Sequence, residues 1–137
     1  MKGVCRRAAA DKTVMEKVYT PNAPEAVGPY SQAMKANGLV FTSGQIAIDP
    51  ETNTVHAVTI EEQTEQVCKN LAAVLQAAGS GLDRVVKTVC FLADMGDFAA
   101  FNAVYAKYFP SLPARSCVAV KDLPKGVKVE VEAIAER

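Results

Sequence analysis

The sequence predicts an α+β domain in which two helices pack on one face of a mixed sheet of about six strands. Three observations support this prediction. An Asn-Gly pair separates two strand-like runs, two helical segments with apolar faces follow it, and alternating apolar residues end the chain. The expected order is three strands, a helix, a strand, a helix and two strands.

The first strands are predicted from turn signals. A short strand is expected at "EKVYT", followed by a proline-stiffened loop at "PNAPEAVGPY". Two further strands are expected at about 32–36 and 39–46, because Asn37 and Gly38 suit a type I′ turn, whose two central residues both need positive φ. The polar stretch "DPETNT" then turns the chain.

The first helix is predicted over "TIEEQTEQVCKNLAAVLQAAG". Thr59 suits the N-cap, and Glu62 follows three residues later, which is the pattern of a capping box. Apolar residues recur at helical spacing and form one stripe, which consists of Val67, Leu71, Val74, Leu75 and Ala78.

The second helix is predicted over "DFAAFNAVYAKYF", with Asp97 as its cap and Pro110 as its stop. Its expected apolar face consists of Phe98, Phe101, Tyr105 and either Tyr108 or Phe109. Strands are expected at about 84–92 before this helix, and at about 115–120 and "KVEVEAIA" after it. Helices on one face leave the other sheet face uncovered, so we expect a second copy of the chain to cover it.

Length and composition fit one globular domain, expected at residues 16–137, after a flexible tail at residues 1–15. Half of the 137 residues are apolar, and 15 basic residues balance 15 acidic ones. A neutral chain lacks the basic excess that is typical of nucleic-acid binding. No apolar run reaches the roughly 18 residues of a membrane span.

The four cysteines form no C-x-x-C pair, and His56 is the only histidine, so a zinc site is not expected. Cys68 and Cys90 lie in apolar segments and are interpreted as small hydrophobic residues. A cytoplasmic protein with free thiols is therefore predicted. The start "MKGVCRRAAA" is basic and weakly resembles an organelle-targeting segment, and a frayed tail is the alternative.

The stretch "LPARSCVAV" places a permanent cation in an apolar strand. Alternation puts Arg115 and Cys117 on the same strand face. The guanidinium suits a bidentate bond to a substrate carboxylate, or an internal salt bridge to Glu130 or Glu132. The residues alone leave both open. A cation near Cys117 is expected to lower the pKa of its thiol, but no histidine nearby in the sequence offers a base.

Glu130 and Glu132 alternate with valines and are expected on one face of the last strand. They are interpreted either as solvated acids or as a carboxylate that positions water or moves a proton. In "TSGQ", Ser43 offers a hydroxyl and Gly44 permits a close backbone approach. The chain has neither a phosphate-binding glycine motif nor a hydrolase nucleophile elbow.

Three stretches together resemble the RidA/YjgF/UK114 family of reactive-intermediate deaminases: "NAPEAVGPYSQA", "FTSGQIAIDP" and "LPARSCVAVKDLPKGVKVEVEAIA". The resemblance implies a chorismate-mutase-like fold and a homotrimer with active sites between subunits. It also implies a hydrolase that converts 2-imino acids, such as 2-iminobutanoate and 2-iminopropanoate, to 2-oxo acids and ammonia. This activity would protect pyridoxal-phosphate enzymes and uses no cofactor.

The resemblance also implies the roles of site residues. Arg115 would bind the substrate carboxylate, the backbone of Cys117 would contact the imine nitrogen, and Glu130 would activate water. Further substrate-binding positions are Tyr30, Ser43, Gly44 and Asn102. An endoribonuclease or translation inhibitor is the alternative function, as is a non-catalytic carboxylate-binding or chaperone-like protein.

Overall fold

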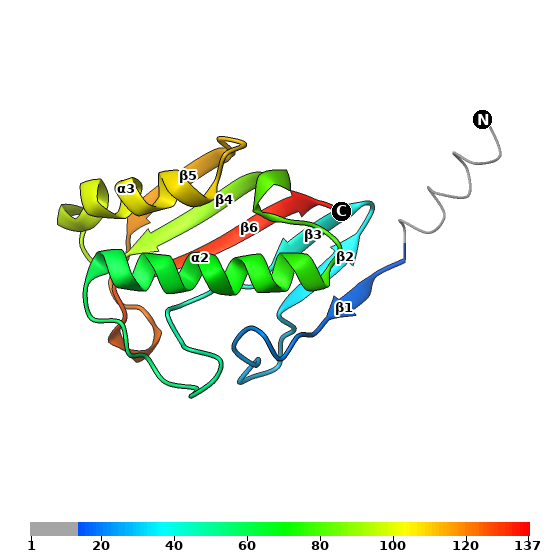
Figure 1. Ribbon diagram of the computed structural model, residues 1–137, viewed down its shortest axis with the longest axis horizontal. Helices are drawn as coiled ribbons and strands as arrows, with labels where there is room; N and C mark the ends of the chain where they lie inside the picture. The colour runs from blue at the N-terminus through cyan, green and yellow to red at the C-terminus, as the bar shows by residue number, and fades with distance from the viewer. Residues whose placement is uncertain (1–13) are drawn as a thin grey trace.

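The computed structural model describes residues 14–137, so the basic start and Cys5 lie outside the described residues. It confirms the predicted fold class: one mixed sheet carries two helices on the same face (Figure 1). The strands are β1 (Glu16–Val18), β2 (Ala33–Ala36), β3 (Leu39–Thr42), β4 (Val85–Leu92), β5 (Ala114–Ala119) and β6 (Val129–Glu136). The helices are α2 (Ile60–Ala77) and α3 (Phe98–Tyr108), with 3-10 turns at Leu82–Arg84, Met95–Asp97 and Pro124–Gly126.

The sheet has the strand order β1-β2-β3-β6-β4-β5. All neighbours are antiparallel except β4 and β5, which α3 connects in parallel as a crossover helix. The last strand in the chain, β6, therefore lies inside the sheet, and β5 lies at one edge. The strand that we predicted over 39–46 ends earlier, at Thr42, because the backbone leaves the ladder at the next two residues.

The local signals are confirmed at the hairpin and at the first helix. Asn37 and Gly38 have φ values of 52° and 77°, as a type I′ turn requires. Thr59 and Glu62 form the predicted capping box of α2. Asp97 occupies the N-cap of α3, but its side chain makes no capping hydrogen bond, so that part of the prediction is wrong. Its backbone already continues a 3-10 turn, with φ −88° and ψ 1°, instead of the extended conformation typical of a capping residue.

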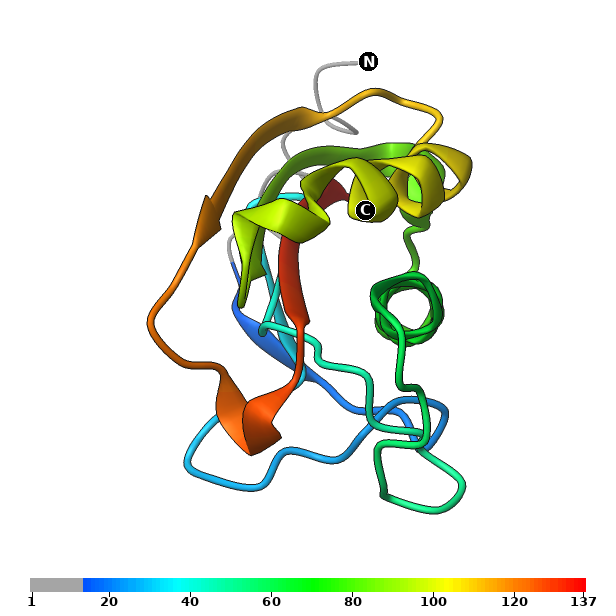
Figure 2. The same ribbon diagram turned by 90° about the vertical axis from the view of Figure 1, so that its left-hand side faces the viewer.

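The hydrophobic core lies between the sheet and the two helices, which Figure 2 shows on the same side of the strands. The predicted aromatic face of α3 is confirmed for Phe101, Tyr105 and Phe109, all of which are buried, while Tyr108 is only partly buried. Stacking continues along this face, with ring centroids 4.3 Å apart for Tyr105 and Phe109. Nothing in the described part of the chain forms a helix long and apolar enough to cross a membrane.

Within residues 14–137, both α-helices lie on one side of the sheet, and the opposite face carries neither of them (Figure 2). Large apolar side chains on the strands remain exposed, including Phe41 at 41%, Val86 at 43% and Val118 at 47%. We call this surface the open face. An apolar sheet face of this kind favours association with another protein surface.

Candidate active site

The site residues predicted from the sequence form two groups on opposite faces of the sheet. In the ladder between β4 and β5, Arg115 lies opposite Thr88, which is buried beneath α3. In the ladder between β4 and β6, Glu130 lies opposite Phe91, three residues further along β4 and on the open face. Side chains alternate between faces along a strand, so Arg115 and Glu130 cannot meet within one chain.

The Arg115 group lies between β5 and α3. Nη1 of Arg115 donates a hydrogen bond of 2.7 Å to Oδ1 of Asn102. The guanidinium lies 4.9 Å from the ring centroid of Tyr105 and 5.5 Å from that of Phe98, within the range of cation–π interactions. Within residues 14–137, Arg115 makes no ion pair, so the salt bridge to Glu130 or Glu132 is not formed. Its charge is therefore available to an anion.

Cys117 is not an activated nucleophile. Burial raises the pKa of its thiol, and Arg115 lowers this pKa, as expected, but offsets the effect of burial only in part. The thiol packs against the hydrophobic core, where desolvation outweighs the nearby cation. The neighbouring Cys90 is fully buried, and burial raises its pKa to about 12, as fits its interpretation as a small hydrophobic residue. The thiols of both residues stay protonated near neutral pH.

The Glu130 group begins at a bulge between β3 and β6. After Phe41 pairs with Ile134, the next backbone bridge joins Gln45 to Val131, which leaves one extra residue on the first strand. The backbone at Ser43 and Gly44 therefore turns out of the ladder beside Glu130.

Position 44 requires glycine because its backbone lies close to the side chain of Glu130. A Cβ atom at this position would lie 2.8 Å from Cδ of Glu130 and would collide with its carboxylate oxygen. Only glycine allows this backbone and this carboxylate to adopt their observed positions.

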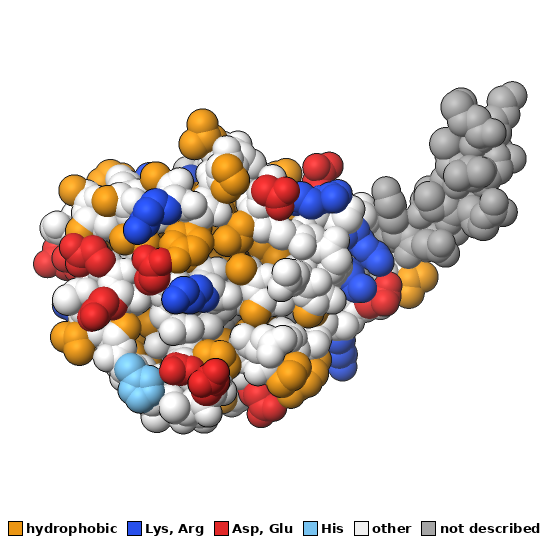
Figure 3. Space-filling view, in the orientation of Figure 1, with side chains coloured by type: hydrophobic (Ala, Val, Ile, Leu, Met, Phe, Trp, Pro, Cys, Tyr) orange, Lys and Arg blue, Asp and Glu red, His pale blue; other side chains and the backbone are white. Residues whose placement is uncertain are grey.

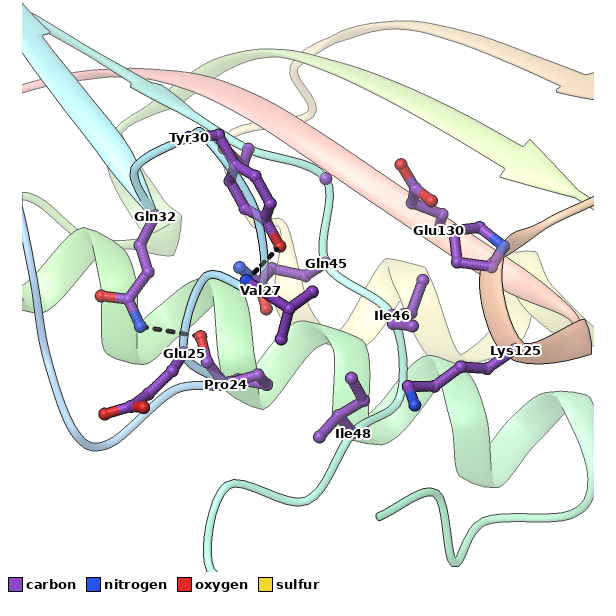
Figure 4. Close-up of a pocket in the computed structure, with 13 residues that line it drawn as sticks. Pro24, Glu25, Val27, Tyr30, Gln32, Gln45, Ile46, Ile48, Lys125 and Glu130 are labelled. Atoms are coloured by element: carbon purple, nitrogen blue, oxygen red, sulfur yellow. Dashed lines mark hydrogen bonds between the residues drawn. The ribbon is translucent and has the colours of Figure 1, made fainter. Parts of the chain in front are cut away.

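The bulge lines a cavity of about 460 Å³, in which Glu130, Tyr30 and Gln45 are drawn in Figure 4. The Tyr30 hydroxyl accepts a hydrogen bond of 3.3 Å from the backbone N–H of Val27. The Ser43 hydroxyl donates one of 2.6 Å to the carbonyl of Ser31. The other lining residues are Pro24, Glu25, Val27, Gln32, Gly44, Ile46, Ile48, Pro124 and Lys125.

The surroundings of Glu130 favour the protonated form of its carboxyl. Burial raises the pKa of its carboxyl, and the nearby Glu132 raises it further. Such shifts are frequent at catalytic carboxyls, which must take up and release a proton near neutral pH. In the described residues, no three His, Cys, Asp or Glu side chains group closely enough to hold a metal ion.

Sequence reasoning missed the aromatic surroundings of Arg115 and the cavity residues Ile46 and Lys125. Tyr105 and Phe98 were predicted only as parts of an apolar helix face. Lys125 has a φ of 56°, unusual for a residue other than glycine, but no local pattern marked it. Ile46 directly follows the "TSGQ" stretch, whose Ser43 and Gly44 were predicted as site residues.

Fold and site define a small α+β protein with a half-buried arginine at a sheet edge that forms no ion pair within residues 14–137, and known proteins share this fold. A family model described as Endoribonuclease L-PSP matches residues 20–137. The chain is 54% identical over 124 residues to a RutC family protein of Synechocystis, and the alignment covers 88% of this chain and 95% of that protein. It is 49% identical over 128 residues to the chloroplastic Reactive Intermediate Deaminase A of Arabidopsis thaliana, covering 93% of this chain and 68% of that protein.

Solved structures agree with these sequence matches. The crystal structure of Escherichia coli TdcF with bound serine superposes with a TM-score of 0.85 at 40% identity, covering 89% of this chain and 98% of that one. The chain therefore belongs to the RidA/YjgF/UK114 family, whose model carries the L-PSP description.

Proposed function

We propose that this protein hydrolyses 2-imino acids, such as 2-iminobutanoate and 2-iminopropanoate, to 2-oxo acids and ammonia. The observation that carries the proposal is Arg115, a half-buried guanidinium whose polar partner is the neutral Asn102. Such a cation suits a small carboxylate, which can accept two parallel hydrogen bonds from it. The relative named as a reactive intermediate deaminase, at 49% identity, supports the same reaction.

The proposed active site takes its two groups from two copies of the chain. Arg115, Asn102 and Cys117 would come from one subunit, and Glu130 with the Tyr30 cavity from its neighbour. The apolar open face supports this arrangement, because it offers a surface for a second copy beside Glu130. We further propose that the assembly is a homotrimer, as the family resemblance implies.

In the proposed mechanism, Arg115 binds the substrate carboxylate and so fixes the imine carbon in place. Glu130 takes a proton from a water molecule while the water oxygen attacks that carbon of the protonated imine, which gives a neutral tetrahedral carbinolamine. The same carboxyl then gives its proton to the nitrogen. The C–N bond breaks and ammonia leaves, while the hydroxyl proton returns to the Glu130 carboxylate as the carbonyl forms. The backbone of Cys117 contacts the imine nitrogen, so the thiol takes no part.

An RNA-directed activity is the second candidate, because the matching family model carries the name of an endoribonuclease. The charge distribution gives it little support. The chain has no net charge, and basic and acidic side chains are interspersed on the helix-covered face in Figure 3. Nucleic-acid binding is usually accompanied by a continuous basic surface.

The test generates 2-iminobutanoate in situ with a threonine dehydratase and follows its disappearance. We expect the wild-type protein to accelerate this step, Arg115→Ala to abolish the acceleration and Glu130→Ala to reduce it by about 10²-fold or more. Arg84→Ala, which removes an exposed arginine outside both groups, serves as the control and should keep the wild-type rate.

A wild-type protein that gives no acceleration would refute the deaminase proposal. RNA cleavage that survives repurification and disappears in Arg115→Ala would favour the second candidate instead. Sedimentation of the wild-type protein as a monomer would contradict the two-subunit site.

A further inference from the structure

Asn102 occupies one donor of Arg115 without cancelling its charge. Its Oδ1 accepts from Nη1 at 2.7 Å, and both side chains are half-buried between α3 and β5. An amide oxygen is neutral, so the guanidinium keeps its full positive charge. A carboxylate at the same place would form an ion pair and compete with any anionic ligand.

Tyr105 supports the flat face of the same guanidinium. Its ring centroid lies 4.9 Å from Cζ of Arg115, the shortest of three such aromatic contacts. The ring is itself fixed at both ends, by stacking on Phe109 and by a buried hydrogen bond of 2.7 Å between its hydroxyl and that of Thr88. Thr88 is the residue opposite Arg115 in the strand ladder. Thr88 therefore pairs with the arginine through the sheet and also binds the hydroxyl of Tyr105, whose ring lies against the guanidinium.

These contacts leave one edge of the guanidinium free. In the part of the chain that the structure describes, Nε and Nη2 donate to no protein acceptor. These two donors point in parallel from one edge of the planar group and match the two oxygens of a carboxylate.

We propose that Asn102 and Tyr105 are positioning residues that turn the Nε–Nη2 edge of Arg115 toward the substrate carboxylate, with the buried Thr88 hydroxyl holding Tyr105 in place. The inference rests on the proposed function. It gives Asn102 a role different from the one expected from the sequence: the amide acts on the arginine and does not touch the substrate. The neutral amide is the feature that keeps Arg115 free for an anion.

The test uses Asn102→Asp, which keeps the size of the side chain but adds a charge. Binding of 2-oxobutanoate, the product of the proposed reaction, is measured by calorimetry. We expect its affinity to fall about tenfold or more, because the new carboxylate pairs with Arg115 and repels the ligand. The KM for 2-iminobutanoate should rise by a similar factor, with kcat within about threefold of wild type. Gln76→Glu, the same kind of change on the exposed side of α2, should alter neither value.

A second pair of variants tests the buried hydroxyl. Thr88→Val removes the hydroxyl that bonds to Tyr105 but keeps the shape of the threonine side chain. Thr88→Ser keeps the hydroxyl. We expect Thr88→Val to weaken 2-oxobutanoate binding about three- to tenfold and to broaden the NMR signal of the Arg115 Nε–H, and Thr88→Ser to restore both. A general loss of stability would not selectively change that signal.

Three outcomes would overturn the inference. If the wild-type protein binds 2-oxobutanoate and Asn102→Asp binds it equally well, Asn102 does not control the arginine, although the deaminase proposal stands. If Thr88→Val leaves both the affinity and the Arg115 signal unchanged, the support through Tyr105 is absent. A wild-type protein that neither binds 2-oxobutanoate nor accelerates imine loss would refute the proposed function, and the inference with it.

Discussion

Replacing Gly44 with alanine tests whether the bulge beside β3 exists to place Glu130. The added Cβ would lie 2.8 Å from Cδ of Glu130, a distance that real Cβ contacts almost never reach, and 3.0 Å from its Cγ, which is closer than most such contacts. The backbone of Glu130 is held between two strands in β6, so its side chain must move instead. An off-rotamer side chain costs about 1 kcal/mol of stability. A displacement of about 1 Å at a catalytic group can cost about 10²-fold in rate, which corresponds to about 2.7 kcal/mol of activation free energy.

We therefore expect Gly44→Ala to lose about 10²-fold in kcat for 2-iminobutanoate with only a small loss of stability. The rate is measured in the threonine dehydratase assay, and the free energy of unfolding by urea titration. Gly81→Ala is the matched control, because a Cβ there would crowd the Asp83 carboxylate at 2.8 Å outside the site. This variant should keep the wild-type rate.

A double-mutant cycle separates the proposed cause from general damage. If Gly44→Ala acts through Glu130, adding it to Glu130→Ala should produce no further loss of rate. The reasoning would be refuted if Gly44→Ala kept the wild-type kcat while Glu130→Ala lost it, since the crowded carboxylate would then tolerate the methyl group without moving.

Three further predictions concern single groups. Burial and Glu132 raise the pKa of Glu130 above its ordinary value of 4.5. Between the ordinary pKa and the raised one, the folded state binds more protons than the unfolded state. This carboxyl therefore lowers the stability of the protein as the pH rises from the ordinary pKa to the raised pKa. Glu130→Gln should therefore be more stable than wild type in urea at about pH 7 and equal to it at about pH 4, and a pH-independent difference would contradict this. Cys117→Ala should keep most deaminase activity, because the Cys117 thiol stays protonated and only the backbone of this residue is proposed to contact the substrate. Loss of activity in a variant that circular dichroism shows to be folded would instead give the sulfur a role. Thr59→Ala should lower the free energy of unfolding by about 1 kcal/mol in urea titrations, because it opens the capping box with Glu62, and an unchanged value would show that this cap adds nothing.

The features that the sequence predicted well depend on residues close together in the chain. The Asn37-Gly38 turn and the Thr59 capping box each involve at most four consecutive residues, whose backbone preferences are strong on their own. The bulge after Thr42 was missed because the stretch "TSGQ" is small and polar, so it has no apolar alternation whose change of phase could reveal an extra residue. It became visible only when the ladder with β6 was known.

The site was harder to predict because it depends on how distant segments align. Alternation correctly placed Glu130 and Glu132 on one face of their strand. It could not relate that face to the face of Arg115, because the relation depends on the register of both strands against β4. The contact between Arg115 and Asn102 likewise requires the crossover of α3 over β5, which no local pattern encodes.

The placement of Arg115 and Glu130 on opposite faces of one sheet has a genetic consequence. In the proposed assembly, a subunit that lacks Arg115 can still lend its Glu130 to a neighbour, and a subunit that lacks Glu130 can lend its arginine. Two inactive alleles expressed together would then complement each other, with about a quarter of the sites intact in an equal, random mixture of subunits. Each mutation would then be recessive when the two are expressed together, although both residues are proposed to act on the same substrate molecule.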